Sequence, residues 1–152
     1  SRVPFQVIVF LRRLDANGPE YLVLKRADLS VWQGVAGGGE GDESPREAAI
    51  RETMEEVGQR DEAIDLESVA MVPVLDVVGC YRWGDDVLEI PEYAFCVDVD
   101  TSVVVRLSEE HAEYRWCSAR EALDLLEWDS NRKALCVAEA RMAAGAPVGE
   151  LS

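Results

Sequence analysis

Positive charge is scarce in this chain. Its 15 Lys and Arg residues face 30 Asp and Glu residues, which gives the 152 residues a formal net charge of −15. A surface of that sign repels nucleic acid and anionic membranes, so we expect neither a nucleic-acid polymer nor a membrane as partner. A small phosphorylated substrate remains compatible with the charge, provided that metal ions and a few local Lys or Arg side chains offset the field.

The sequence also lacks paired cysteines and long apolar runs. Its four cysteines form no CxxC pair and no metal-ligand spacing. Each of them lies in an apolar context, which predicts buried, reduced thiols in a reducing compartment: Cys80, Cys96, Cys117 and Cys136. Neither a signal peptide nor a membrane-spanning segment is recognisable. These observations predict a cytoplasmic protein.

No linker, internal repeat or low-complexity segment divides the chain. At 152 residues, 48% of them hydrophobic, it is long enough to bury a core, and we expect a single domain over residues 1–152. Runs of β-branched and aromatic residues predict strands over 3–13, 21–26, 92–99 and 114–117, and an extended stretch over 66–78. Loops are predicted over 15–19, 79–86 and 109–111. Helices are predicted over 45–57, 119–126 and from 129 or 130 to about 144.

This order of elements predicts an α/β fold with a mixed sheet between helical layers. The first helix has the clearest boundaries. Ser44 and Glu47 have the spacing of a capping box around Pro45 at the first helical position, and Gly58 is a natural C-terminal stop. Apolar residues at positions i, i+4 and i+7 predict its buried stripe: Ile50, Met54 and Val57.

Three glutamates crowd one turn of this helix. Glu52 lies three and four positions from Glu55 and Glu56, so the carboxylates share a face and repel one another. A divalent cation would reverse that repulsion, because magnesium prefers hard carboxylate oxygens. Just upstream, the glycines at 37–39 form a loop that can approach a ligand closely. The sequence therefore predicts a metal site on the helix.

The spacing Gly37-x5-Glu43-x7-Arg51-Glu52-Thr53-x-Glu55-Glu56-x-Gly58 resembles the Nudix box, G-x5-E-x7-R-E-U-x-E-E-x-G-U with U an aliphatic residue. All seven fixed positions match. The chance of this at a given start is on the order of 10⁻⁷ or less from typical residue usage. Thr53 and Gln59 occupy the two aliphatic positions, where they bear on packing rather than on metal binding. The box covers residues 37–59.

The resemblance implies a Nudix-type α/β/α sandwich with a catalytic loop-helix-loop and a Mg²⁺ cofactor, with Mn²⁺ as a possible substitute. It also implies which groups hold the metal ions: Glu52, Glu55, Glu56 and the backbone carbonyl of Ala36. Gly37, Glu43 and Arg51 would support these ligands, the last two by pairing to orient the glutamates. Bound Mg²⁺ would neutralise phosphate oxygens and activate water for hydrolysis of a diphosphate linkage.

Shorter segments are similar, in order, to the dihydroneopterin triphosphate pyrophosphatase branch of the family, also called dATP pyrophosphohydrolase: Trp32-Gln33, Glu92-Tyr-Ala-Phe95-Cys96, Glu110-His111-x2-Tyr114-x-Trp116 and Trp128-x-Ser130-Asn131-Arg132. This resemblance implies Glu110 as a further metal ligand or the general base, with Glu109 as its competitor and Glu52 as the other candidate base. The catalytic set is then Glu52, Glu55 and Glu110, and His111 is expected to orient the loop. Implied substrate contacts are Arg2, Lys25 or Arg26, and Asn131, and the aromatic residues Tyr81 and Trp83 would stack on a ring.

The expected reaction is cleavage of dihydroneopterin triphosphate or dATP between the α and β phosphates, giving a monophosphate and pyrophosphate. Three other substrates stay open: 8-oxo-dGTP, ADP-ribose and dinucleoside polyphosphates. Val35-Ala36-Gly37 stands where enzymes of the last type carry Pro-Lys-Gly, and the chain lacks room for the additional N-terminal sheet of ADP-ribose enzymes.

A non-catalytic Nudix sensor is the rival class, but such sensors usually lose box glutamates, and all four are present here. An acidic interaction domain would explain the charge without explaining the motif. The chain could be a monomer or a homodimer.

Overall fold

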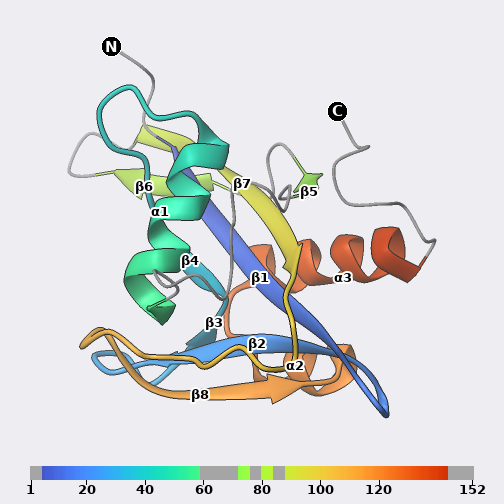
Figure 1. Cartoon of the computed structure of the whole chain (residues 1–152). Helices are drawn as coiled ribbons and strands as arrows, with labels where there is room; N and C mark the ends of the chain where they lie inside the picture. Colours follow the sequence, from blue (N-terminus) through green and yellow to red (C-terminus); the bar gives the residue numbers. More distant parts are fainter. Residues whose placement is uncertain (1–4, 59–71, 76–79, 84–87, 144–152) are drawn as a thin grey trace.

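The computed structural model describes residues 5–58, 72–75, 80–83 and 88–143, with only the backbone described for 72–75, 80–83, 88–91 and 141–143. Eleven helices and strands lie in these ranges: β1 Gln6–Asp15, β2 Gly18–Arg26, β3 Trp32–Gln33, β4 Val35–Gly38, α1 Pro45–Val57, β5 Val72–Leu75, β6 Cys80–Trp83, β7 Leu88–Asp98, β8 His111–Cys117, α2 Ala119–Leu125 and α3 Asp129–Ala143 (Figure 1).

The sheet is mixed, as the sequence predicts. Its main path runs β3-β2-β1-β7-β5, with β4 paired to β1, β6 to β7 and β8 to β2. The central pair β1 and β7 is parallel, and the other pairs are antiparallel. The hairpin between β1 and β2 closes at Asp15 and Gly18, which confirms the predicted turn.

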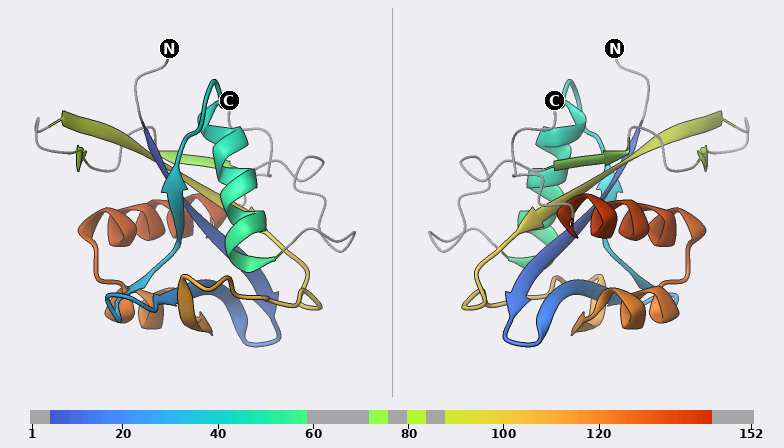
Figure 2. Two further views of the ribbon diagram at one scale, coloured as in Figure 1. Left: turned by 90° about the vertical axis from the view of Figure 1, so that its left-hand side faces the viewer. Right: turned by 90° about the vertical axis from the view of Figure 1, so that its right-hand side faces the viewer.

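Strand β1 is buried on both faces, so its residues divide between two cores. Val7, Val9 and Leu11 pack toward α1, whereas Ile8 and Phe10 pack toward α2 and α3. Figure 2 shows α1 on one side of the β1–β7 pair and α3 on the other. This burial explains the continuous apolar run of β1, which is typical of a strand covered on both faces. The predicted α/β/α sandwich is confirmed.

The strand boundaries differ from the prediction at several places. β3 and β4 were not predicted as strands, and Gly37 and Gly38, expected in a loop, lie in β4 because that segment pairs antiparallel with β1. Cys80–Trp83, expected in a loop, is strand β6, which pairs antiparallel with Leu88–Pro91, so that β7 begins before Glu92. Similarly, β8 begins at His111, inside the predicted loop, because it continues its pairing with β2 as far as Arg26. These corrections have one cause: hydrogen bonds to a partner strand elsewhere in the chain decide where a strand lies, and local turn signals do not reveal that partner.

Helix α1 has the predicted ends but a different buried face. Ser44 and Glu47 form both bonds of the capping box, and Gly58 adopts a left-handed conformation with φ of 68°. Of the predicted stripe only Val57 is fully buried, since Ile50 and Met54 are half-buried. The fully buried positions are Ala48, Ala49, Thr53, Glu56 and Val57. Ala49, Thr53 and Glu56 are spaced i, i+4 and i+7, so they share the face of the helix that is buried.

The cysteine prediction is correct in part. Cys96 and Cys117 are buried free thiols, and burial raises the pKa of Cys96 to about 12 and that of Cys117 to about 11. Cys136 is exposed on α3, so the expectation of four buried thiols is wrong there. The side chain of Cys80 lies outside the described residues. None of the helices described is long and apolar enough to cross a membrane.

Candidate active site

Glu52 lies against the end of β4, and Gly37 makes this possible. A Cβ atom on Gly37 would lie 2.1 Å from Cδ of Glu52, and real structures do not tolerate such a distance. The carboxylate therefore occupies the space that a side chain at position 37 would fill. Only 12% of the Glu52 side chain is exposed. The glycine loop and the helix thus meet at one carboxylate.

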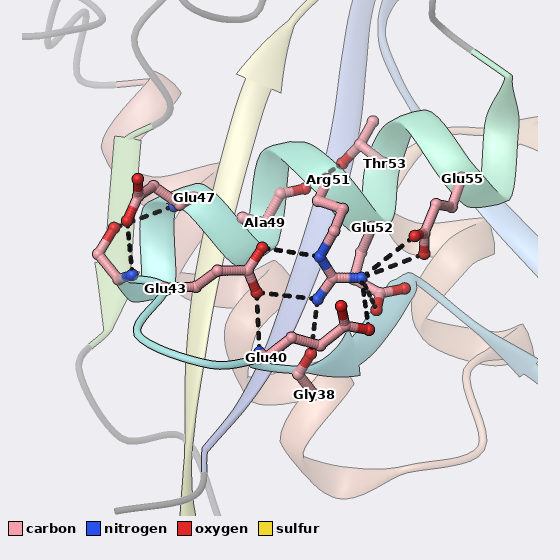
Figure 3. Close-up of polar contacts among 10 residues, drawn as sticks. Gly38, Glu40, Glu43, Glu47, Ala49, Arg51, Glu52, Thr53 and Glu55 are labelled. Carbon is pink, nitrogen blue, oxygen red and sulfur yellow. Dashed lines mark hydrogen bonds and ion pairs between the residues drawn. The ribbon is translucent and has the colours of Figure 1, made fainter. Parts of the chain in front are cut away.

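Arg51 joins the loop, the helix and the carboxylates (Figure 3). Its Nε and Nη2 atoms donate to the two oxygens of Glu43 at 2.7 and 3.0 Å, and Nη2 also donates to the Gly38 carbonyl at 2.8 Å. Its Nη1 atom donates to Glu52 at 2.9 Å and to Glu55 at 3.1 Å. The bonds from Arg51 lower the pKa of Glu43 and raise that of Arg51 itself. The structure therefore brings Arg51 and Glu43 together as the sequence pattern expects.

Glu56 is the most deeply buried of the three helix glutamates, with 2% of the residue exposed. Burial, followed by the hydrogen bond and the charge of Glu52, raises the pKa of Glu56 to about 10. The Ala36 amide nitrogen lies 3.5 Å from Oε1 of Glu56, which puts the backbone of Ala36 beside this carboxylate; the metal contact of its carbonyl stays a prediction. Nε2 of His111 lies 3.5 Å from the same oxygen. The Glu52–Glu56 pair is thus buried with little positive charge facing Glu56.

The donors of this pair fit a hard divalent cation. Two adjacent carboxylates withdrawn from water are costly unless a positive charge compensates them, and carboxylate oxygens are the preferred ligands of Mg²⁺. Within residues 5–58 and 92–140, no three acidic, histidine or cysteine side chains are arranged as a ready metal cage. At α1 such a cage is not formed because Glu55, whose side chain is 45% exposed, directs both of its oxygens toward Arg51. The chemistry of the donors fits, and Glu55 has solvent around it in which to turn.

A segment distant in sequence completes the site. The backbone amides of Arg106 and Ser108 donate to the carbonyls of Val57 and Glu56 at 3.0 and 3.2 Å. Gly58 permits this approach, because a Cβ atom there would lie 2.7 Å from that of Arg106. The segment leads to Glu110, whose charge contributes to the raised pKa of Glu56. The structure therefore brings the predicted remote carboxylate near the helix glutamates, with its own side chain exposed.

Three of the predicted substrate contacts are described with their side chains, and each of them contacts another residue of the chain. Arg26 is the strand partner of His111, and its guanidinium pairs with Asp28 at 2.6 Å. Lys25 makes a 3.4 Å contact with Glu113. The side-chain oxygen of Asn131 accepts a 2.9 Å hydrogen bond from the Gly34 amide, which secures the start of α3 to the bend before β4. Arg2 and the side chains of Tyr81 and Trp83 lie outside the described residues.

One contact near this bend was not expected from the sequence. Nε1 of Trp128 donates to Oε1 of Gln33 at 3.1 Å, while 41% of Trp128 remains exposed. Both residues lie in the short similar segments, but no local spacing relates positions so far apart. The contact of His111 with Glu56 was missed for the same reason.

An α/β/α sandwich that gathers a glycine loop, a capped helix and several carboxylates around one arginine defines a class, the metal-dependent phosphoanhydride hydrolases. The particular family follows from comparison with known proteins: the NUDIX domain model matches residues 4–137, and the chain belongs to this family of hydrolases. Nudix hydrolases generally use divalent metal ions and act on small phosphorylated substrates.

Two curated relatives indicate the branch. The dihydroneopterin triphosphate diphosphatase of Haemophilus influenzae is 30% identical over 137 residues, covering 85% of this chain and 83% of that protein. The asymmetrical bis(5'-nucleosyl)-tetraphosphatase of Sus scrofa is 31% identical over 135 residues, covering 85% and 87%. The resemblance to the dihydroneopterin triphosphate branch is thereby confirmed.

Solved structures share the whole architecture. A NUDIX hydrolase from Listeria monocytogenes superposes with a TM-score of 0.78 at 35% identity, covering 97% of this chain and 99% of that one. The dihydroneopterin triphosphate pyrophosphohydrolase of E. coli superposes with a TM-score of 0.70 at 26% identity, covering 86% and 91%.

Proposed function

We propose that this chain is a Mg²⁺-dependent pyrophosphohydrolase that cleaves a nucleoside or pterin triphosphate, dihydroneopterin triphosphate or dATP, between the α and β phosphates. Water attacks phosphorus, the phosphoanhydride bond breaks, and a monophosphate and pyrophosphate leave. The observation that carries this proposal is the buried Glu52–Glu56 pair beside Arg51: burial in this pair raises the pKa of Glu56, and a divalent cation bound there would replace the proton that this carboxyl retains. We expect a single Nudix domain that acts in the cytoplasm.

Five groups would hold the metal: the side chains of Glu52, Glu55, Glu56 and Glu110 and the carbonyl of Ala36. The bound ions would neutralise phosphate oxygens and lower the pKa of the attacking water. Glu52 or Glu110 would accept the proton of that water. Arg51 keeps Glu52 in place through its bonds to Glu43 and Gly38, and Gly37 leaves room for the carboxylate. Positive charge for the phosphates would come from Arg2, Lys25 and Arg26, and Asn131 would lie toward the organic part.

A second candidate substrate is a bis(5'-nucleosyl) tetraphosphate, which would be cleaved asymmetrically. Similarity to the Sus scrofa enzyme, at 31% identity, favours it. The bulk and charge of the two substrates differ at the end remote from the cleaved bond, and Val35-Ala36-Gly37 stands where such enzymes carry Pro-Lys-Gly. We rank the triphosphate first for this reason.

A substrate panel with phosphate and pyrophosphate measured separately tests the proposal. It comprises dihydroneopterin triphosphate, the dNTPs, oxidised dNTPs, ADP-ribose and diadenosine polyphosphates. We expect pyrophosphate from a triphosphate, loss of activity with EDTA and recovery with excess Mg²⁺. Cleavage that resists EDTA would exclude the metal-dependent reaction. Release of ATP and AMP from diadenosine tetraphosphate at a higher kcat/KM would favour the second candidate.

The glutamates are tested by substitution. Glu55→Gln and Glu56→Gln should each lower kcat by about 100-fold or more while the protein stays folded, because an amide binds a hard cation poorly. Asp124→Asn, an exposed carboxylate on α2, is the matched control and should leave kcat unchanged. Full activity in the purified Glu56→Gln protein would refute the assignment of the site.

A further inference from the structure

His111 is the single histidine of the chain, and the structure buries it at the site. Only 2% of its side chain is exposed. Neither ring nitrogen has a hydrogen-bond partner among the described residues. Buried polar groups normally have such partners, so a buried imidazole without one requires an explanation. Oε1 of Glu56 lies 3.5 Å from Nε2.

A bulge in β8 directs this side chain toward α1. Lys25 pairs with Glu113 and Arg26 pairs with His111, so Ala112 is an extra residue in the ladder. Successive side chains of a strand alternate between faces. Without the bulge His111 would lie on the same face as Glu113 and Cys117, and Cys117 packs toward α2 and α3. The bulge moves His111 to the opposite face, where α1 lies, as bulges beside active sites commonly do.

The backbone on both sides of the imidazole is fixed. The His111 amide donates to the Ser108 carbonyl at 3.2 Å, and the Ser108 amide donates to the Glu56 carbonyl at 3.2 Å. The Ala27 amide donates to the Glu110 carbonyl at 2.9 Å, which ties the same turn to the end of β2. In Figure 1 the chain that leads into β8 passes by the C-terminal end of α1. His111 therefore has a defined position relative to the Glu56 carboxylate.

An imidazole is suited to this position for an electrostatic reason. A neutral ring with its proton on Nε2 can donate to a carboxylate oxygen without adding positive charge. A Lys or Arg side chain there would compete with a bound cation for Glu56. Groups that hydrogen-bond to a metal ligand orient it and strengthen binding in this way.

We propose that His111 is a positioning residue whose Nε2–H group holds the Glu56 carboxylate in the orientation that binds a divalent cation. The inference rests on the proposed function, since it presupposes a metal at Glu56. It assigns His111 a role in metal affinity, beyond the orientation of its loop, and it links the helix to the turn that carries Glu110.

Three substitutions of His111, made in the full chain, separate this role from simple packing. In His111→Gln the amide nitrogen occupies the position of Nε2, so a donor to Glu56 is retained. In His111→Asn the amide reaches only the position of Nδ1, and in His111→Phe the volume remains without any donor. The readout is Mn²⁺ affinity in the absence of substrate, measured by titration with electron paramagnetic resonance. Thermal unfolding of each protein monitors the fold.

We expect the Kd for Mn²⁺ to rise about 10- to 100-fold in His111→Phe and His111→Asn, in line with the usual effect of removing a partner of a metal ligand. His111→Gln should stay within about threefold of the original protein, which corresponds to less than 1 kcal/mol. Unchanged affinity in His111→Phe, or equal weakening in all three variants, would overturn the inference. A separate control detects failure of the proposed function: the original protein must bind Mn²⁺ and Glu56→Gln must lose that binding, whatever the His111 variants do.

Discussion

Glu52 can lie against β4 only because residue 37 has no side chain. A Cβ atom at position 37 would collide with the carboxylate of Glu52, because Cδ and both oxygens of that carboxylate lie within 2.5 Å of the position that the Cβ atom would take. Gly38, one residue further on, is exposed, and a Cβ atom there would make only an ordinary 3.7 Å contact with the Phe5 carbonyl. Two neighbouring glycines therefore have different reasons to be in the loop.

This difference gives a prediction at a single residue. Gly37→Ala should displace the Glu52 carboxylate and lower kcat/KM by about 100-fold, since a small misplacement of a catalytic group has an effect of this size. Gly38→Ala is the matched control and should stay within about threefold. Steady-state kinetics with the best substrate of the panel measures both. Equal kinetics in the two variants would show that the contact at Gly37 does not matter for turnover.

At the scale of elements, Arg51 and Glu43 join the loop after β4 to helix α1. The pKa of Glu43 is held below its ordinary value by this contact. A carboxyl with a lower pKa in the folded state contributes stability above its unfolded pKa, and the contribution is lost as the pH falls through the folded pKa. The link between loop and helix is therefore acid-sensitive.

Glu43→Gln should remove this part of the pH dependence. We expect the free energy of unfolding of the original protein to fall more steeply between about pH 5 and pH 3 than that of the variant. At pH 7 the variant should be the less stable of the two. Urea unfolding at several pH values, followed by circular dichroism, provides the measurement. Parallel pH profiles for the two proteins would contradict the assignment.

The C-terminal end of α1 is a second element-scale feature. Gly58 has a φ of 68°, and a Cβ atom there would also meet Arg106 at 2.7 Å. Gly41 has a comparable φ of 54° with open space around it. A larger residue would be strained at either position because of the left-handed backbone. At position 58 it would also clash with the segment that leads to Glu110.

Alanine at the two positions separates strain from conflict. Gly41→Ala should lower the free energy of unfolding by about 1 kcal/mol, the usual cost of a left-handed conformation. Gly58→Ala should cost more, about 2–3 kcal/mol, and should also weaken activity because the turn with Glu110 moves away from the helix. Urea unfolding of both variants measures the two losses. Equal losses of stability in the two variants would contradict the prediction, because they would show that Arg106 moves away from the new Cβ atom without cost.

At the scale of the whole molecule, α3 is attached to the sheet by a half-buried polar cluster. Tyr21 donates to Glu139 on α3, and Arg12 pairs with Asp98 at 2.9 Å on the neighbouring strand. Burial and the bond to Glu139 raise the pKa of Tyr21, so its hydroxyl remains a donor across the working pH range. These contacts lie away from the glutamates of α1 and serve to hold the helical layer in place.

The net charge of −15 acts on the whole molecule as well. Self-repulsion destabilises a compact state, and salt screens it over a Debye length of about 10 Å at 0.1 M. We expect the Tm to rise by a few degrees between about 20 and 300 mM NaCl without Mg²⁺. Asp124→Asn, which removes one exposed negative charge, serves as a comparison and should show a smaller rise. A Tm that falls with salt would indicate that attractive ion pairs, such as those of Arg51, dominate.

Several elements could be predicted from the sequence because their signals are local. The capping box at Ser44 and the stop at Gly58 each depend on a few neighbouring residues, and the structure confirms them. Strand β6 and the start of β8 were not predictable, because their hydrogen-bond partners lie elsewhere in the chain. The exposure of Cys136 depends on which face of α3 meets the sheet, which apolar composition alone does not tell.

The sequence by itself determined the family, the layered fold and the set of helix carboxylates, since all of these follow from spacing within short stretches and from the periods of helix and strand. Only the tertiary structure decided that Glu56 is more deeply buried than Ile50 and Met54, because the packing of α1 against the sheet selects which part of its circumference is covered. It also decided that His111 reaches Glu56 and that Glu110 lies near it. Those contacts depend on strand register and on one bulge, and no local pattern encodes the register between distant segments.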